Sequence, residues 1–143
     1  MTLQETKLYA EDVARRLPAR VYALSGELGA GKTAFSQFFL RALGVTGTIT
    51  SPTFVVMKPY SLDPALARGH RVAYHMDCYR LSDPRELEAL GFAAIVADPA
   101  NVVIVEWAEK IRDLIPAGAV WIDFSHGAEE GDRAISVRGE SIS

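Results

Sequence analysis

Cysteine is almost missing from this 143-residue sequence, because Cys78 is the only one. A single cysteine excludes an intramolecular disulfide and with it the disulfide-stapled class of small secreted domains. Apolar runs are short as well: the longest uncharged one, Ala89 to Ala97, falls far below the roughly 20 residues of a membrane-spanning helix. Charges recur throughout Met1 to Arg20, which lacks the apolar centre of a secretory signal. We therefore expect a cytoplasmic protein that does not enter a membrane.

Positive charge is too sparse for a surface that binds nucleic acid independently. The net charge is −3, with nine Lys/Arg against five Asp/Glu in residues 1–72 and six against thirteen in residues 73–143. No basic stretch with interleaved aromatic residues occurs in either half. Any contact with RNA is therefore expected inside a larger assembly.

One glycine-rich segment is the most informative feature that is present. Residues 26–33, Gly-Glu-Leu-Gly-Ala-Gly-Lys-Thr, match the phosphate-binding pattern G-x-x-x-x-G-K-[ST] at every position. Its glycines allow successive backbone N–H groups to form a concave nest for phosphate oxygens. We expect Lys32 to reach the β- and γ-phosphates from a solvent-filled site, and the Thr33 hydroxyl to bind Mg²⁺.

The neighbours of this segment support the same interpretation. Residues 20–25 form an apolar run typical of a buried strand, and residues 33–43 have apolar residues at helical spacing before Gly44. Strand, glycine loop and helix in this order place a helix N-terminus beneath the phosphates. The sequence therefore predicts binding of a nucleoside triphosphate. It contains no Asn-Lys-x-Asp motif, and no Asp-x-x-Gly follows a strand, so a GTPase is disfavoured.

The remaining pattern predicts an α/β protein with one domain over residues 1–143. Helical spacing covers residues 3–17, and Pro18 closes that segment. Two β-rich runs with a long connection predict an antiparallel hairpin. The other expected elements are a helix from Pro84 capped by Asp83 or Ser82, a buried strand Asn101 to Glu106, a short helical piece Ile111 to Ile115, and late strands Val120 to Phe124 and Ala134 to Val137; the hairpin strands are Phe54 to Tyr60 and Arg71 to Tyr79, joined through 63–70.

Two carboxylates lie at or near the ends of predicted strands and are candidates for catalysis or metal binding. Glu106 closes the buried strand, and in phosphate-loop proteins an acid at the end of the neighbouring strand serves Mg²⁺. Asp77 lies near the end of the run from Arg71 to Tyr79, where it would assist the metal's outer shell or orient the attacking water. A turn cap remains the alternative for Asp77. Trp107 is a core aromatic or a cover for the triphosphate.

Three neighbouring features carry weaker expectations. His75 is expected to be a satisfied structural histidine rather than a metal ligand, because no His/Cys cluster accompanies it. Arg80 is open to a phosphate, an acidic neighbour or no partner. Thr50 to Thr53 follows the loop's helix, where nucleotide switches often place a hydroxyl that senses the γ-phosphate. A turn capped by hydroxyls is the simpler interpretation of that segment.

The ordered set G-E-L-G-A-G-K-T, T-S-P-T-F, H-M-D-C-Y-R-L and V-E-W-A-E resembles the TsaE (YjeE) family. The resemblance implies a small bacterial ATPase with a P-loop NTPase fold: a mostly parallel central sheet with an antiparallel hairpin and flanking helices. It implies ATP and Mg²⁺ as cofactors and TsaB and TsaD as partners in making threonylcarbamoyladenosine at position 37 of ANN-decoding tRNAs. In that family TsaE supports turnover of the complex and is not the transferase.

The same resemblance assigns roles to individual residues. Asp77, Lys32 and Glu106 match catalytic positions, and Thr33 and Glu106 match the Mg²⁺ ligands. The positions matching nucleotide contacts are Thr6, Gly29, Ala30, Gly31, Lys32, Thr33, Trp107 and Arg133. Thr50 to Thr53 matches the switch-like segment, whereas the connection from Pro64 to Arg71 is longer than the family pattern leads us to expect.

Two other functions remain open at this point. A small-molecule kinase would use Asp77 as the base toward a substrate hydroxyl, but kinases of that type usually need several lid arginines. After Glu106 only Arg112, Arg133 and Arg138 are available, and they are scattered. A nonenzymatic, nucleotide-dependent interaction module is the third possibility, because a binding site does not guarantee hydrolysis.

Overall fold

A six-stranded sheet organises the computed structural model, which describes residues 2–26, 31–50, 57–126 and 133–138. The strand order is β2-β3-β4-β1-β5-β6. The four inner strands pair in parallel, whereas each edge strand pairs antiparallel with its neighbour. The strands are β1 (Val21–Gly26), β2 (Met57–Ser61), β3 (Val72–Asp77), β4 (Asn101–Glu106), β5 (Val120–His126) and β6 (Arg133–Arg138). The predicted mostly parallel sheet with an antiparallel hairpin is confirmed.

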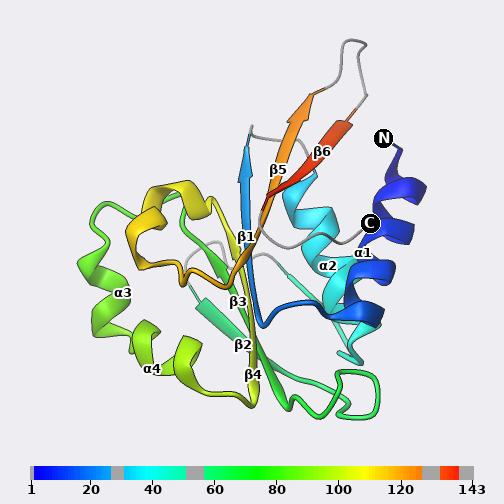
Figure 1. Ribbon diagram of the computed structural model, residues 1–143, viewed down its shortest axis with the longest axis horizontal. Coiled ribbons are helices and arrows are strands. Elements are labelled where there is room, and N and C mark those ends of the chain that lie inside the picture. Colours follow the sequence, from blue (N-terminus) through cyan, green and yellow to red (C-terminus); the bar gives the residue numbers. More distant parts are fainter. Residues whose placement is uncertain (1, 27–30, 51–56, 127–132, 139–143) are drawn as a thin grey trace.

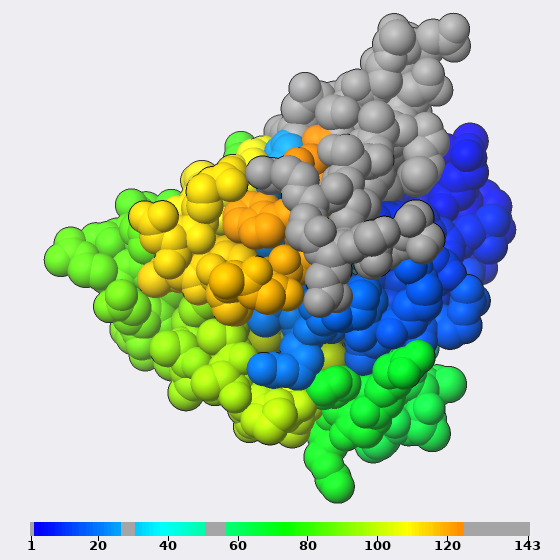
Figure 2. All heavy atoms as spheres, in the orientation of Figure 1, coloured from blue at the N-terminus to red at the C-terminus, as the bar shows by residue number. Residues whose placement is uncertain are grey.

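Helices cover both faces of this sheet (Figure 1). One face carries α1 (Leu3–Arg16) and α2 (Lys32–Ala42), whose Val13, Phe35 and Phe39 pack on it. The other carries α3 (Arg85–Ala89), α4 (Phe92–Ala97) and the 3-10 helix η1 (Ala108–Leu114). In the space-filling view the α3–α4 side and the α1 side form opposite flanks of the molecule (Figure 2). Two apolar cores result, one on each face of the sheet.

Local sequence explains where these elements begin and end. All six residues of β4 are buried, as expected for a central parallel strand covered on both faces. The start of α1 is fixed by a capping box, in which Glu5 N–H donates to the Thr2 hydroxyl and Thr2 N–H donates to the Glu5 carboxylate. Leu17 in the left-handed region and the following Pro18 end this helix.

The helix and strand predictions are largely confirmed, with two differences in the helices. The apolar run from Ala89 to Ala97 contains α4, which the sequence analysis did not predict. The predicted helical piece near Ile111 is a 3-10 helix that begins three residues earlier. The predicted helix from Pro84 is α3, which begins at Arg85. Its N-cap is Pro84, which makes no side-chain cap hydrogen bond, whereas the predicted cap Asp83 accepts from Arg85 N–H at 3.0 Å. The predicted residues 54–56 of the hairpin lie outside the described residues.

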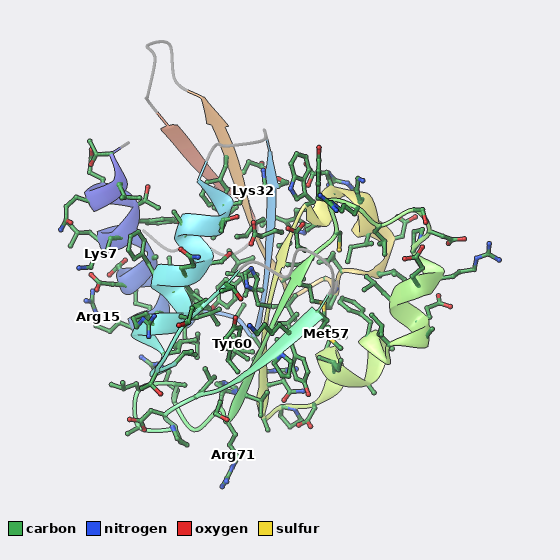
Figure 3. The ribbon with its side chains drawn as sticks, turned by 180° about the vertical axis from the view of Figure 1, so that it is seen from behind. Lys7, Arg15, Lys32, Met57, Tyr60 and Arg71 are labelled. Carbon is green, nitrogen blue, oxygen red and sulfur yellow. The ribbon has the colours of Figure 1, made fainter. Side chains whose placement is uncertain are left out.

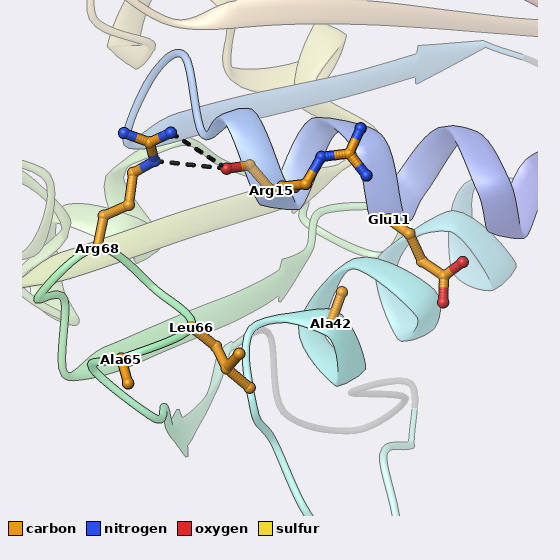
Figure 4. Close-up of a pocket in the computed structure, with 6 residues that line it drawn as sticks. All are labelled: Glu11, Arg15, Ala42, Ala65, Leu66 and Arg68. Atoms are coloured by element: carbon orange, nitrogen blue, oxygen red, sulfur yellow. Dashed lines mark hydrogen bonds between the residues drawn. The ribbon is translucent and has the colours of Figure 1, made fainter.

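The long connection between β2 and β3 packs back onto the helices beside it. Asp63 N–H donates to the Leu43 carbonyl, and the Arg68 guanidinium reaches the Arg15 carbonyl. Between this connection and the two helices α1 and α2 lies a surface hollow of about 370 Å³. It is lined by Glu11, Arg15, Ala42, Ala65, Leu66 and Arg68 (Figure 4). This hollow adjoins the C-terminal ends of α1 and α2 and is separate from the glycine-rich loop, which precedes α2.

No helix within the described residues is long and apolar enough to cross a membrane.

The turn after α2 requires glycine at one position more strictly than at another. Gly44 has φ +98°, and a Cβ there would lie 2.5 Å from Cβ and 2.8 Å from N of Asp63. Gly47 has φ +79° but nothing within 4 Å of an added Cβ. We expect Gly44→Ala to lower the free energy of unfolding by about 2–4 kcal/mol, and Gly47→Ala by about 1 kcal/mol from backbone strain alone. Urea unfolding of both variants measures the difference; equal losses would mean that the Asp63 contact relaxes freely.

Candidate nucleotide-binding site

The site lies where the inner strands end at one edge of the sheet. In the parallel ladders Leu24 of β1 is paired with Glu106 of β4, and Glu106 is paired with Asp77 of β3. Parallel strands place their carboxyl ends at the same edge, which is where ligands bind in open α/β sheets. Strand order therefore brings Asp77 and Glu106, 29 positions apart in the sequence, next to the end of β1.

The glycine-rich loop connects the end of β1 to the start of α2. Gly31 is the N-cap of α2 with φ +108°, a conformation that side-chain-bearing residues rarely adopt. Gly26 has φ +123°, and a Cβ there would lie 1.8 Å from the Phe124 carbonyl oxygen of β5. Both glycines are thus required by backbone geometry. The predicted phosphate contacts Gly29 and Ala30 lie outside the described residues and stay predictions.

Thr33 and Glu106 meet directly. The Thr33 hydroxyl donates to Oε1 of Glu106 at 2.8 Å, and Glu106 is only 2% exposed. A hydroxyl and a carboxylate oxygen are hard donors of the kind Mg²⁺ prefers, and their separation lets one ion contact both. The pair predicted to serve the metal therefore fits it. Within the described part of the chain no group of three or more His, Cys, Asp or Glu side chains could hold a metal.

Lys32 is the clearest correction to the sequence analysis. Instead of facing a solvent-filled site, its side chain is 4% exposed at the start of α2, beside the end of β1 (Figure 3). Its ammonium donates to the Gly26 carbonyl at 2.8 Å and lies 4.0 Å from the centre of the Trp107 ring. The carbonyl and the ring face replace water around the charge, which is why burial is tolerated.

Trp107 reaches this position because the chain turns sharply after β4. Its φ of +58° directs the backbone away from the sheet and lets the ring pack beside Lys32. The ring centre also lies 4.9 Å from that of Tyr79, which follows β3. Trp107 therefore links the ends of two strands to the loop lysine, a position that suits the predicted role as a cover over the phosphates.

Asp77 has both a structural contact and an unusual environment. Its Oδ1 accepts from Tyr79 N–H at 2.9 Å, which is the turn contact that the sequence analysis left open as the alternative. Burial raises the pKa of Asp77 above its ordinary value of 3.8, the Tyr79 hydrogen bond opposes this, and the negative charge of Glu106 adds to the rise. A half-buried carboxyl beside the candidate Mg²⁺ ligands Thr33 and Glu106 is suited to accept or release a proton.

Glu109 is a contributor that the sequence analysis missed. This residue lies in the first turn of η1, and its Oε2 accepts from Gly26 N–H at 3.1 Å. Gly26 is the first residue of the glycine-rich segment, so Glu109 anchors the point where the loop leaves β1. The acid three residues after Glu106 is visible in the sequence, but only the fold of η1 directs it to Gly26.

The structure places the other predicted residues as follows. Thr6 is buried in α1, where its hydroxyl donates to the Thr2 carbonyl at 3.0 Å. Arg133 begins β6 opposite His126, and its side chain lies outside what the structure describes. Thr50 accepts from the Lys58 ammonium, whereas Ser51 to Thr53 lie outside the described residues. The nucleotide contacts of Thr6 and Arg133 and the switch role therefore stay predictions.

The raised pKa of Asp77 can be tested by measuring how protein stability depends on pH. The pKa of Asp77 is higher in the folded protein than its ordinary value of 3.8, so the folded state binds the proton of this carboxyl more tightly than the unfolded state does. This proton binding stabilises the fold at low pH, and the stabilisation is lost as the pH rises from 3.8 through the pKa of the folded protein. Asparagine stays neutral at every pH and keeps an oxygen for Tyr79 N–H. We expect Asp77→Asn to be more stable than the wild type at about pH 7 and equal to it near about pH 3.5, in urea unfolding at both pH values. A gap that widens on acidification would contradict this assignment.

Comparisons with known proteins find one named family. A family model described as "Threonylcarbamoyl adenosine biosynthesis protein TsaE" matches residues 1–135. Proteins named tRNA threonylcarbamoyladenosine biosynthesis protein TsaE are similar to this chain: 40% identity over 114 residues in Bacillus subtilis, 31% over 103 in Haemophilus influenzae and 33% over 135 in Treponema pallidum. The matched segments are 79%, 72% and 94% of this chain.

Coverage of the relatives themselves is uneven. The match spans 66% of the Bacillus protein and 61% of the Haemophilus protein, less than two thirds of each, but 93% of the Treponema protein. The crystal structure of Bacillus subtilis YdiB superposes with a TM-score of 0.72 at 30% identity, covering 94% of this chain and 78% of that one. Family model, relatives and shared P-loop architecture converge: the chain belongs to the TsaE family, whose members are named for the biosynthesis of threonylcarbamoyladenosine in tRNA.

Proposed function

We propose that this protein is an ATPase that acts in the cytoplasm with TsaB and TsaD in forming threonylcarbamoyladenosine on tRNA. The observation that carries the proposal is the contact between the Thr33 hydroxyl and Glu106, 2.8 Å apart although 73 positions separate them. Together with Gly31 at the N-cap of α2, this contact reproduces the arrangement in which P-loop proteins hold a triphosphate and its metal. The names of the similar proteins, which refer to threonylcarbamoyladenosine biosynthesis in tRNA, support the pathway.

Each residue would have a distinct role in hydrolysis. The N-terminus of α2 and Lys32 bind the phosphates, with Lys32 leaving the Gly26 carbonyl for a phosphate oxygen. Thr33 and Glu106 hold Mg²⁺, which when bound neutralises charge on the β- and γ-phosphates. Asp77 orients a water molecule toward the γ-phosphorus and accepts its proton as the bond to the leaving oxygen breaks, which yields ADP and phosphate.

The position of Asp77 beside the metal pair allows a direct test. We expect Asp77→Asn to bind ATP within about threefold of the wild type, because shape and the Tyr79 contact are kept. Hydrolysis should fall by about two orders of magnitude, the scale of a lost base or orienting group. Calorimetry measures affinity and release of labelled phosphate measures turnover.

A matched control is available in Asp98, an exposed residue whose Oδ1 makes the same kind of turn contact with Ala100 N–H at 2.9 Å. Asp98→Asn should leave both measurements unchanged. Wild-type hydrolysis in Asp77→Asn would assign Asp77 to the turn alone, and transfer of label to an added small-molecule acceptor instead of water would favour a kinase.

The partnership with TsaB and TsaD needs a separate measurement. If ATP hydrolysis drives a conformational change in this protein, its capture by immobilised TsaB–TsaD should differ between ATP, ADP and no nucleotide. We expect at least about a tenfold difference in apparent affinity between two of these states, the size of a typical allosteric coupling. Equal capture in all three would refute a nucleotide switch, and no capture in any would refute the partnership.

A further inference from the structure

His75 is a buried polar residue of β3 that contacts Glu106, one of the two candidate Mg²⁺ ligands. It lies on β3 on the same sheet face as Ala73, which packs in the α1–α2 core, and it is fully buried. Its Nε2 lies 2.6 Å from Oε2 of Glu106, which is itself 2% exposed. The two residues come from neighbouring strands, since His75 is paired with Ile104 in the β3–β4 ladder.

The hydrogen bonds around Glu106 use its two oxygens for different purposes. Oε1 accepts from Thr33, the other candidate metal ligand, whereas Oε2 accepts from His75. A metal-ligating carboxylate only accepts hydrogen bonds, so Nε2 of His75 must carry the proton and donate it. Oε2 is thus held by β3, and Oε1 is directed at Thr33 in α2.

A purely structural role explains this histidine poorly. Nδ1 of His75 is buried and has no hydrogen-bond partner within the described part of the chain. Strands β3 and β4 are already joined along their full six-residue lengths. An apolar side chain would fill the same space without burying an unpaired ring nitrogen, which is usually costly. The contact with Glu106 is what an apolar residue would not supply.

We propose that His75 is a positioning residue for the metal site: its Nε2–H fixes the rotation of the Glu106 carboxylate so that Oε1 faces Thr33. The inference rests on the proposed function, because it concerns the residues that would hold Mg²⁺. Hydrogen bonds from outside the metal's own ligands commonly orient those ligands, and their loss typically weakens metal affinity by about 10–100-fold. His75 would therefore act on metal binding and not on the phosphates directly.

A matched pair of substitutions separates the hydrogen bond from the volume of the side chain. His75→Gln places an amide N–H near the position of Nε2, whereas His75→Met has a similar length and no donor. Met76→Ala serves as the stability control, because Met76 is buried in the core on the opposite face of the same strand. The measurements are ATP affinity by calorimetry at a series of Mg²⁺ concentrations and without Mg²⁺, together with thermal unfolding.

We expect His75→Met to need about 10–100-fold more Mg²⁺ than the wild type for the same ATP affinity, with metal-free affinity unchanged. His75→Gln should recover most of this loss, and Met76→Ala should unfold at a lower temperature with no change in Mg²⁺ requirement. If His75→Met does not fold, His75→Asn replaces it, because the shorter asparagine stays polar but its amide does not reach the position of Nε2.

The possible outcomes separate the positioning role of His75 from the proposed Mg²⁺ site on which it rests. Equal Mg²⁺ requirements in the wild type and the donor-free variant would overturn the positioning role alone. The same shift in Met76→Ala would also overturn it, because the effect would then come from stability. A wild-type protein whose ATP affinity does not respond to Mg²⁺ would overturn both the positioning role and the proposed metal site.

Discussion

The parallel pairing of β1 with β4 is the constraint on which the site depends. Leu24 is paired with Glu106, so the strand that leads into the glycine loop ends beside the strand that carries the acid. A shift of one residue in this register would send Glu106 to the opposite face, away from Thr33. The register is held by burial, because five residues of β1 and all six of β4 are buried. The core thus specifies the chemistry through the alignment of two strands.

The sequence predicted the parts of the site that local patterns encode. The phosphate loop follows from glycine spacing and its strand–helix context, and β4 follows from a continuous apolar run that ends at Glu106. The meeting of Thr33 with Glu106 was inferred only by analogy with other phosphate-loop proteins. The residue pattern within one β-strand does not reveal which strand lies next to it in the sheet, since pairing partners are distant in the sequence. Strand order had to come from the structure.

Side-chain environments were harder to predict than positions. Nothing in the local sequence indicates that Lys32 is covered by Trp107, because this depends on the turn after β4, where Trp107 adopts a φ of +58°. The same turn begins η1 and directs Glu109 to Gly26. His75 was predicted to be a satisfied structural histidine, but its Nδ1 has no hydrogen-bond partner among the described residues. Its contact with Glu106, 31 positions away, was not predicted. In each case the missing information was a contact between elements that only the sheet brings together.

The covered position of Lys32 also affects how strongly a nucleotide can bind. Its ammonium already has a carbonyl at 2.8 Å and an aromatic face at 4.0 Å, so a phosphate must replace these contacts rather than hydration alone. Net affinity is therefore the difference between the new charge-assisted hydrogen bonds and the contacts given up, which is smaller than the gross attraction. Movement of Lys32 would also free the Trp107 ring, which contacts Tyr79 at the end of β3. Under the proposed function, phosphate binding would therefore disturb contacts that reach Tyr79, two residues after Asp77.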